Sequence, residues 1–128
     1  MQALAAPDIF DFGNFRFDRR RGGLFRRGKD GPDVPVALGS RALDILALLL
    51  DQRGELVTKD EITATVWHGA VIEESNLTVH IAALRRILDE DRPQGSSIQT
   101  VVGRGYRFVA ELARLSADRP SAAPRNRR

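Results

Sequence analysis

A chain of 128 residues with 42% hydrophobic side chains can form one domain with its own core, plus tails. It has no cysteine, which excludes a disulfide framework and a thiolate metal site. It has no secretory signal at its start and no apolar run of the roughly 18 residues that a membrane span needs, so we expect a cytoplasmic protein. The net charge of +3 is unevenly spread: residues 14–29 hold seven Lys and Arg against one Asp, whereas residues 30–74 hold nine Asp and Glu against three Lys and Arg, which suggests a polarised surface.

The first forty residues are typical of a small antiparallel sheet. Aromatic and polar residues alternate from Phe10 to Asp18 and change phase at Gly13-Asn14, which predicts a strand with a turn or bulge. Short strands are predicted at Leu24–Arg26 and Val34–Leu38, with glycine-containing turn signals between them. Residues 1–7 are expected to be a flexible N-terminus.

Two helices follow. From Ser40, an N-cap candidate, to Gly54 the chain is apolar nearly all round, with Leu43, Leu46, Ala47 and Leu50 at helical spacing, so we predict the central buried helix here. Thr58-Lys59-Asp60-Glu61 has the form of a capping box, which predicts a second helix that ends near Trp67.

The stretch from Ser75 to Asp89 predicts a third helix with two unlike faces. Leu77, Ile81, Leu84 and Leu88 form one apolar stripe that must be buried. The opposite face is small and polar, with a basic end, and consists of Ser75, Asn76, Val79, Ala82, Ala83 and Arg86. Such a face can approach a DNA groove closely, although an ordinary alanine-rich surface helix would look the same.

The last structured stretch, residues 98–109, has two β-rich runs around Gly103-Arg104-Gly105 and predicts a hairpin whose tip carries an arginine between two glycines. Residues 113–128 are poor in apolar bulk and rich in Pro, Ala, Ser and Arg, so we predict a disordered basic tail or linker. We therefore expect an α+β winged helix at residues 8–112, with an N-terminal antiparallel sheet, a three-helix core with a helix-turn-helix, and a C-terminal hairpin wing.

Several motifs in this order resemble the OmpR/PhoB-type winged-helix family. They are Thr58–Ile62, Val66-Trp67, Asn76–Leu88, Ile98–Val101 and Gly103–Phe108. The resemblance covers roughly residues 8–112 and implies a bacterial transcription regulator that binds double-stranded DNA with the third helix, without a cofactor.

The resemblance also implies individual roles. Base edges would be approached by Asn76, Val79 and Ala83, and phosphates or groove walls by Ser75, His80, Ala82, Arg85 and Arg86. Trp67 and Tyr106 occupy phosphate-contacting positions, and Arg104 is the wing-tip candidate for the minor groove. The loop from His68 to Glu73 matches a segment that touches RNA polymerase in some relatives, and self-association on repeated half-sites and location at the nucleoid are expected.

Two departures from the family pattern are visible. Many relatives have arginines where this chain has Ala82 and Ala83, so base reading would fall to Asn76, Arg86 and apolar contact with thymine methyl groups, or to DNA shape. Only a few residues precede the first strand, so we expect no receiver domain there. The Pro/Arg-rich end fits a linker to a further domain and equally a basic tail.

Three other functions fit the sequence less well. Arg104–Glu111 partly fits an RNA-binding motif, but the order of helices and strands does not. No catalytic or dinucleotide-binding motif is present, and His68 and His80 lack the spacing of a metal site. A winged helix used for protein interaction, with little DNA affinity, stays an alternative. Trp67 and Tyr106 could serve mainly in packing, and Arg85 could pair with Glu74 or Asp89.

Overall fold

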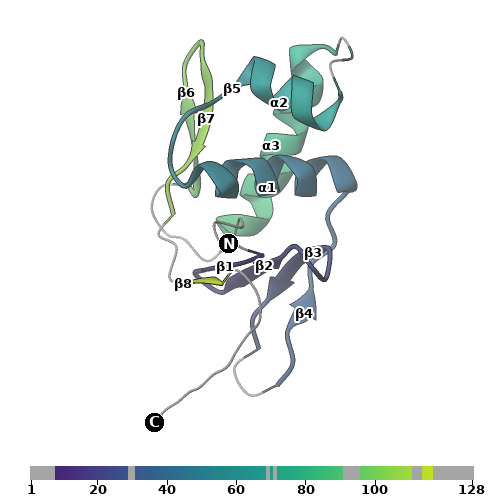
Figure 1. The fold of residues 1–128 in the computed structure, drawn as a ribbon, viewed down its shortest axis with the longest axis vertical. Helices are drawn as coiled ribbons and strands as arrows, with labels where there is room; N and C mark the ends of the chain where they lie inside the picture. Colours follow the sequence, from purple (N-terminus) through teal and green to yellow (C-terminus); the bar gives the residue numbers. More distant parts are fainter. Residues whose placement is uncertain are drawn as a thin grey trace, which may run out of the picture. The chain divides into compact units, whose positions relative to one another are not determined.

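The computed structural model describes residues 8–28, 31–68, 70, 72–90, 96–110 and 114–116. The predicted flexible N-terminus and residues 113 and 117–128 of the predicted tail lie outside them. The chain divides into two compact units, Met1–Val36 with Glu111–Arg128 and Ala37–Ala110, which are described separately (Figure 1). The order of an antiparallel sheet, three helices and a hairpin confirms the predicted α+β winged-helix class.

The first unit is a five-stranded antiparallel sheet in the order β4-β3-β2-β1-β8. Its strands are β1 (Ile9–Phe12), β2 (Phe15–Asp18), β3 (Gly23–Arg26), β4 (Val34–Pro35) and β8 (Arg114–Ser116). The predicted turn at Gly13-Asn14 joins β1 to β2, with Gly13 at φ +54°. The phenylalanines on either side of this turn are all buried, as the alternation predicts: Phe10, Phe12, Phe15 and Phe17.

Strand β8 corrects the prediction that a tail begins at residue 113. Arg114–Ser116 pair with β1, so that Ile9 lies opposite Ser116 and Asp11 opposite Arg114. The tail was predicted from side-chain composition, whereas this pairing uses backbone N–H and C=O groups at the outer edge of β1, which any sequence can satisfy.

A charged pair crosses β1 and β2. The Asp11 carboxylate is 1% exposed and accepts two hydrogen bonds from Arg16, from Nε at 2.7 Å and from Nη2 at 3.0 Å. This hydrogen bonding to Asp11 raises the pKa of the Arg16 guanidinium above its ordinary value, with smaller contributions from the charges of Asp11, Asp33 and Asp18 and an opposing effect of burial. The Arg16 guanidinium therefore stays charged throughout the neutral pH range.

The second unit contains α1 (Ser40–Gln52), α2 (Lys59–Val66) and α3 (Glu74–Leu88). The predicted N-cap Ser40 is wrong: Gly39 is the N-cap, its carbonyl accepts from the Leu43 N–H at 3.1 Å, and Ser40 is already helical. The buried face of α1 is also turned by about one residue from the predicted stripe and consists of Ala42, Ile45, Leu46, Leu49 and Leu50. Leu43 and Ala47 are half-buried, since a helix that is apolar nearly all round does not reveal which face is deepest.

The predicted capping box of α2 is confirmed. The Glu61 N–H donates to Thr58 Oγ1 at 3.0 Å, and the Thr58 N–H donates to Glu61 Oε1 at 2.8 Å. Thr58 also belongs to β5 (Val57–Thr58), a strand that the sequence analysis missed. Strand β5 completes a three-stranded sheet with β7 (Gly105–Phe108) and β6 (Ile98–Val101).

Candidate nucleic-acid interface

Helix α3 has the two faces that its sequence predicts. Leu77, Ile81, Leu84 and Leu88 are each at most 3% exposed, and α3 packs on α1 through the core of the second unit. The opposite face is accessible: Ser75, Asn76, Val79, Ala82 and Arg86 are exposed, and Ala83 is half-buried. Val79 is 63% exposed, which is unusual for an apolar side chain in the middle of a helix. The exposed face thus combines small, apolar and polar groups over about four turns.

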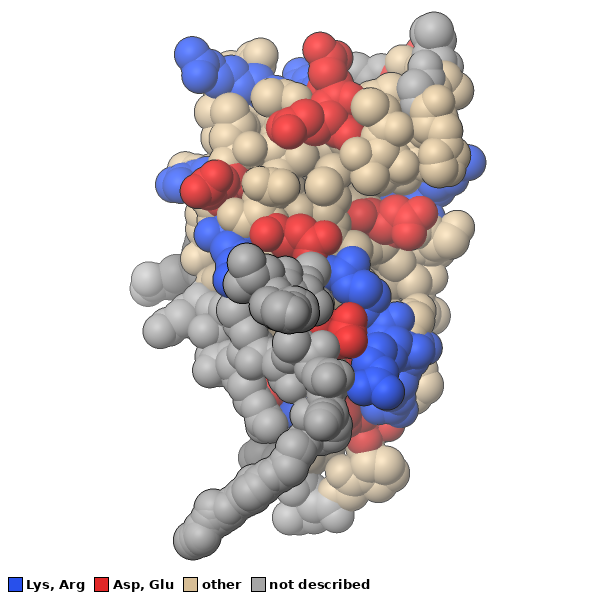
Figure 2. Space-filling model, viewed as in Figure 1, with Lys and Arg blue, Asp and Glu red and all other residues tan. Residues whose placement is uncertain are grey.

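Exposed acidic side chains gather over α1 and α2. Figure 2 shows acidic side chains over the region of α1 and α2, and the exposed acidic residues of this region are Asp44, Asp51, Glu55, Asp60 and Glu61. In the same view α1 crosses in front of α3, so the exposed face of α3 lies on the other side of the unit (Figure 1). The five carboxylates over α1 and α2 outnumber the two exposed arginines at the ends of α1, Arg41 and Arg53, so this region is unfavourable for a polyanion.

The wing is the hairpin β6–β7, whose turn is Val102-Gly103-Arg104. Gly103 has φ +75°, as the predicted glycine at the tip requires. Val102, which the sequence places within a β-rich run, lies in the turn instead and is 89% exposed. The tip therefore presents an apolar side chain as well as Arg104.

Gly105 has a different role from the one predicted. It is buried in β7 opposite Thr58, and a Cβ atom at this position would lie 2.1 Å from the Val57 carbonyl oxygen. Only a residue without a side chain allows β5 to approach this closely. The Lys59 N–H then donates to the Arg104 carbonyl at 3.1 Å, which ties the wing tip to the start of α2.

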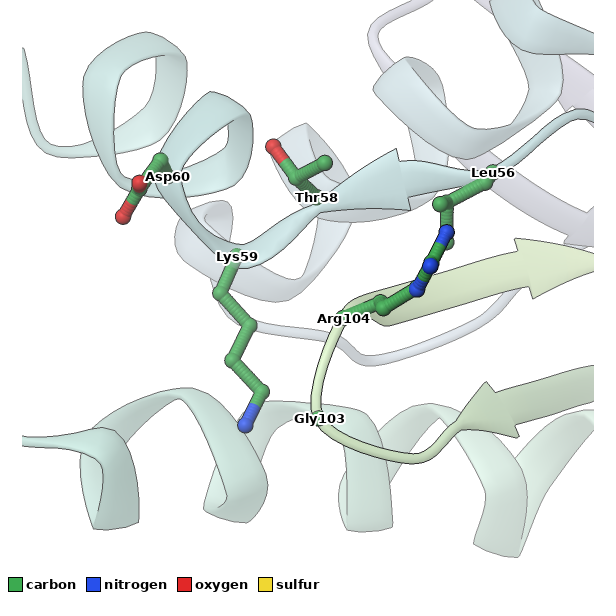
Figure 3. Close-up of a pocket in the computed structure, with 6 residues that line it drawn as sticks. All are labelled: Leu56, Thr58, Lys59, Asp60, Gly103 and Arg104. Atoms are coloured by element: carbon green, nitrogen blue, oxygen red, sulfur yellow. The ribbon is translucent and has the colours of Figure 1, made fainter.

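A pocket of about 430 Å³ lies beside this junction (Figure 3). It is lined by Leu56, Thr58, Lys59, Asp60, Gly103 and Arg104. Arg104 is exposed, but its side chain lies back toward Leu56 and does not extend beyond the turn (Figure 3). Lys59, which the sequence analysis did not single out, places a second cationic side chain at this junction.

Arg85 connects α3 to the wing. Its guanidinium donates to the Ile98 carbonyl from Nε at 3.2 Å and from Nη2 at 2.9 Å, and Nη2 also donates to Thr100 Oγ1 at 2.7 Å. Asp89, the alternative partner considered for Arg85, accepts instead from Ser96 Oγ at 2.6 Å and from the Ser97 N–H at 2.8 Å. Arg85 is thus engaged within the protein.

Tyr106 lies next to Arg85, with the guanidinium carbon 5.9 Å from the ring centroid. Tyr106 is only 5% exposed, so its ring belongs to the packing of the wing, as the alternative reading suggested. Any contact with a phosphate would have to come from the small part that remains accessible.

Trp67 and His80 meet at the end of α2. Both are half-buried, and their ring centroids are 5.7 Å apart, so the structure brings these two predicted residues together. Arg41 of α1 is a second neighbour of Trp67, and its guanidinium carbon lies 5.2 Å from the Trp67 ring centroid. No sequence pattern identified Arg41, because Trp67 lies 26 residues later, beyond the end of α1 and the whole of α2.

Within the residues that the structure describes, no three His, Asp or Glu side chains are grouped so that they could hold a metal ion. The helices among those residues are likewise too short or too polar to cross a membrane.

Comparison with known proteins identifies relatives in transcription. Residues 33–108 match the family model described as "Transcriptional regulatory protein, C terminal". The transcriptional regulator HilA of Salmonella typhimurium is 41% identical over 76 residues, which are 59% of this chain and 14% of HilA. The cholera toxin homolog transcriptional activator of Vibrio parahaemolyticus is 33% identical over 104 residues, which are 80% of this chain and 35% of the activator. The chain therefore spans only a minor part of these curated relatives.

Among solved structures, the DNA-binding domain of Escherichia coli CadC is similar with a TM-score of 0.66 and 23% identity. The similarity covers 85% of this chain and 97% of the CadC domain. At this identity the comparison shows a common fold.

Proposed function

This chain belongs to the OmpR/PhoB-type family of transcriptional regulatory proteins, and we propose that it binds double-stranded DNA sequence-specifically as a bacterial transcription regulator. The observation that carries the proposal is the exposed face of α3, which is small and polar with a basic residue, Arg86, near its end and lies on the side away from α1. In this mechanism α3 enters the major groove and the wing follows the backbone or the adjacent minor groove. We propose no catalytic role, and we place such a regulator in the cytoplasm, at the nucleoid.

The residues divide by what they can contact. Asn76 can pair with adenine, Arg86 can reach a guanine or a phosphate, and both are exposed on α3. Ser75, His80 and Trp67 can donate hydrogen bonds to phosphates near the start of the helix. Arg104 would reach the minor groove after its exposed side chain changes rotamer, whereas Arg85 and Tyr106 would hold the wing beside α3.

Two partners are proposed in addition to DNA. The loop from His68 to Glu73 is the candidate contact for RNA polymerase; Gly69 and Val71 of this loop lie outside the described residues. A single small domain makes few base contacts, so we also propose that two copies bind repeated half-sites.

The test is selection of genomic DNA fragments by the purified full chain at roughly 50 mM and roughly 200 mM salt. We expect a repeated motif to be enriched. If Arg86 or Arg104 contacts a base, its replacement by alanine should weaken binding by roughly 1–3 kcal/mol. If it contacts a phosphate instead, the replacement should reduce the salt dependence of binding. Salt-sensitive binding without a motif would contradict sequence specificity. Absence of binding at low salt would favour the protein-interaction alternative.

A second prediction concerns thymine methyl groups. Val79 presents the largest exposed apolar side chain on the face of α3 that would approach base edges, so we expect it to read the C5-methyl of thymine. Uracil lacks this methyl group, and burying a group of this size contributes roughly 0.8 kcal/mol. Replacing the contacted thymine of the selected motif by uracil should therefore weaken binding about fourfold.

Val79→Ala supplies the control for this prediction. The variant should bind the thymine duplex about as weakly as the wild type binds the uracil duplex, and uracil should cost it nothing further. Uracil placed outside the motif should have no effect on either protein. If the wild type binds both duplexes equally well at every thymine of the motif, Val79 does not read a methyl group.

A further inference from the structure

Three helices of the second unit are joined by side chains at one point. Arg41 lies in the first turn of α1, and its Nη1 donates to the Val66 carbonyl at the end of α2 at 3.3 Å. The same guanidinium lies 5.2 Å from the Trp67 ring, and Trp67 in turn lies 5.7 Å from the ring of His80 on α3. Arg41, Trp67 and His80 thus form a continuous row of neighbouring side chains, with the two rings tilted by 47°, which we call the Arg41 clamp.

The end of α2 needs support from outside the helix. α2 has only eight residues and no basic residue in its last turn, so its own side chains offer no cation to interact with the negative dipole of its C-terminus. His68 follows Trp67 at φ +54°, a backbone conformation that a residue with a side chain rarely adopts. Arg41 supplies both the missing cation and a hydrogen-bond donor at this place.

We propose that Arg41 is a positioning residue for DNA binding, which holds the Trp67 indole against His80 so that both rings meet the DNA backbone in one fixed orientation. This inference rests on the proposed function, since Trp67 and His80 are the phosphate-contacting candidates. An indole fixed before binding loses less side-chain freedom when the complex forms, so the clamp increases affinity without Arg41 itself touching DNA.

Arginine suits this task better than lysine. Its planar guanidinium can lie over an aromatic ring and donate a directed hydrogen bond at the same time. A lysine would keep the charge near the end of α2 but would lose the planar stacking surface. Arg41→Lys and Arg41→Met therefore separate charge from geometry.

Trp67 is the single tryptophan of the chain, so its fluorescence reports directly on the clamp. In the full chain without DNA, Arg41→Met should increase quenching of this fluorescence by iodide, Arg41→Lys should do so to a smaller extent, and Arg53→Met should leave it unchanged. Arg53 is an exposed residue at the other end of α1 and controls for the loss of one positive charge. Circular dichroism sets the temperature at which all variants are folded.

Binding to the duplex enriched by the genomic selection completes the test. Arg41→Met should weaken binding roughly fivefold in the wild-type background and not at all in a Trp67→Ala background. An equal loss in both backgrounds would show that Arg41 contacts DNA independently, and unchanged iodide quenching would show that it does not hold the indole; either result overturns the inference. If the wild type binds no duplex, the proposed function fails with it, whereas binding that is insensitive to Arg41→Met overturns the clamp alone.

Discussion

Gly105→Ala is expected to destabilise the winged unit by more than about 3 kcal/mol, which is the size of effect that a forced backbone displacement in a packed region produces. The added Cβ would lie 2.1 Å from the Val57 carbonyl oxygen and 2.8 Å from the Thr58 Cα. Both neighbours are backbone atoms, so no side-chain rotation can relieve the clash. Thermal unfolding followed by circular dichroism measures the loss.

The same substitution should also abolish specific DNA binding. To admit a Cβ, β5 must leave β7, and the hydrogen bond from the Lys59 N–H to the Arg104 carbonyl must break with it. Thr58 belongs both to β5 and to the capping box of α2, so the displacement reaches the start of that helix as well. We expect no motif to be enriched by this variant under conditions in which the wild type selects one.

Gly103→Ala is the matched control, two residues away in the same hairpin. Its φ of +75° makes an alanine unfavourable by about 1 kcal/mol, but no atom lies within 4 Å of the added Cβ. The winged unit should therefore stay folded and bind DNA. If Gly103→Ala and Gly105→Ala reduced stability and DNA binding equally, the flexibility of the wing tip would be the cause, and the close approach of β5 to β7 would not.

Local patterns predicted the parts of the fold in which the partners are close in sequence. The stripe of α3 follows from spacing alone, and the capping box joins residues three apart, so both could be identified. Gly105 was interpreted as part of a flexible tip because glycine between two β-rich runs usually forms a turn. Its actual strand partner, Thr58, is 47 residues earlier in a strand too short to leave a pattern.

The candidate site was predictable to a similar extent. The exposed face of α3 was identified, since small and polar residues recur there with helical spacing. Arginines were harder to assign, because the same side chain can bind a phosphate or a protein carbonyl. Arg85 donates to the Ile98 carbonyl and Arg41 to the Val66 carbonyl, and a backbone acceptor has no identity in the sequence.

Asp11→Ala is expected to lower the free energy of unfolding by about 3 kcal/mol, because it leaves the partly buried Arg16 guanidinium without the carboxylate that accepts two of its hydrogen bonds. The pKa of Arg16 is raised, so the pair's contribution is fully present below the ordinary arginine pKa and is lost only above it. Because Arg16 is charged at both values, the loss in free energy of unfolding caused by Asp11→Ala should be the same at about pH 6 and about pH 9. Replacing Asp11 by Leu together with Arg16 by Met should recover most of it.

The variant also tests our proposal that the winged-helix domain, which β8 extends to residue 116, unfolds as one cooperative unit. The winged unit is inserted between β4 and β8 of the sheet unit, so folding of the insert brings the ends of a long loop together and lowers the entropic cost of pairing β8 with β1. Unfolding of either unit should then weaken the other. In urea, the Trp67 fluorescence of the winged unit and the circular dichroism of the whole chain should shift to the same lower midpoint in Asp11→Ala. A Trp67 midpoint that stays at the wild-type value while the circular dichroism becomes biphasic would show two independently folding units instead.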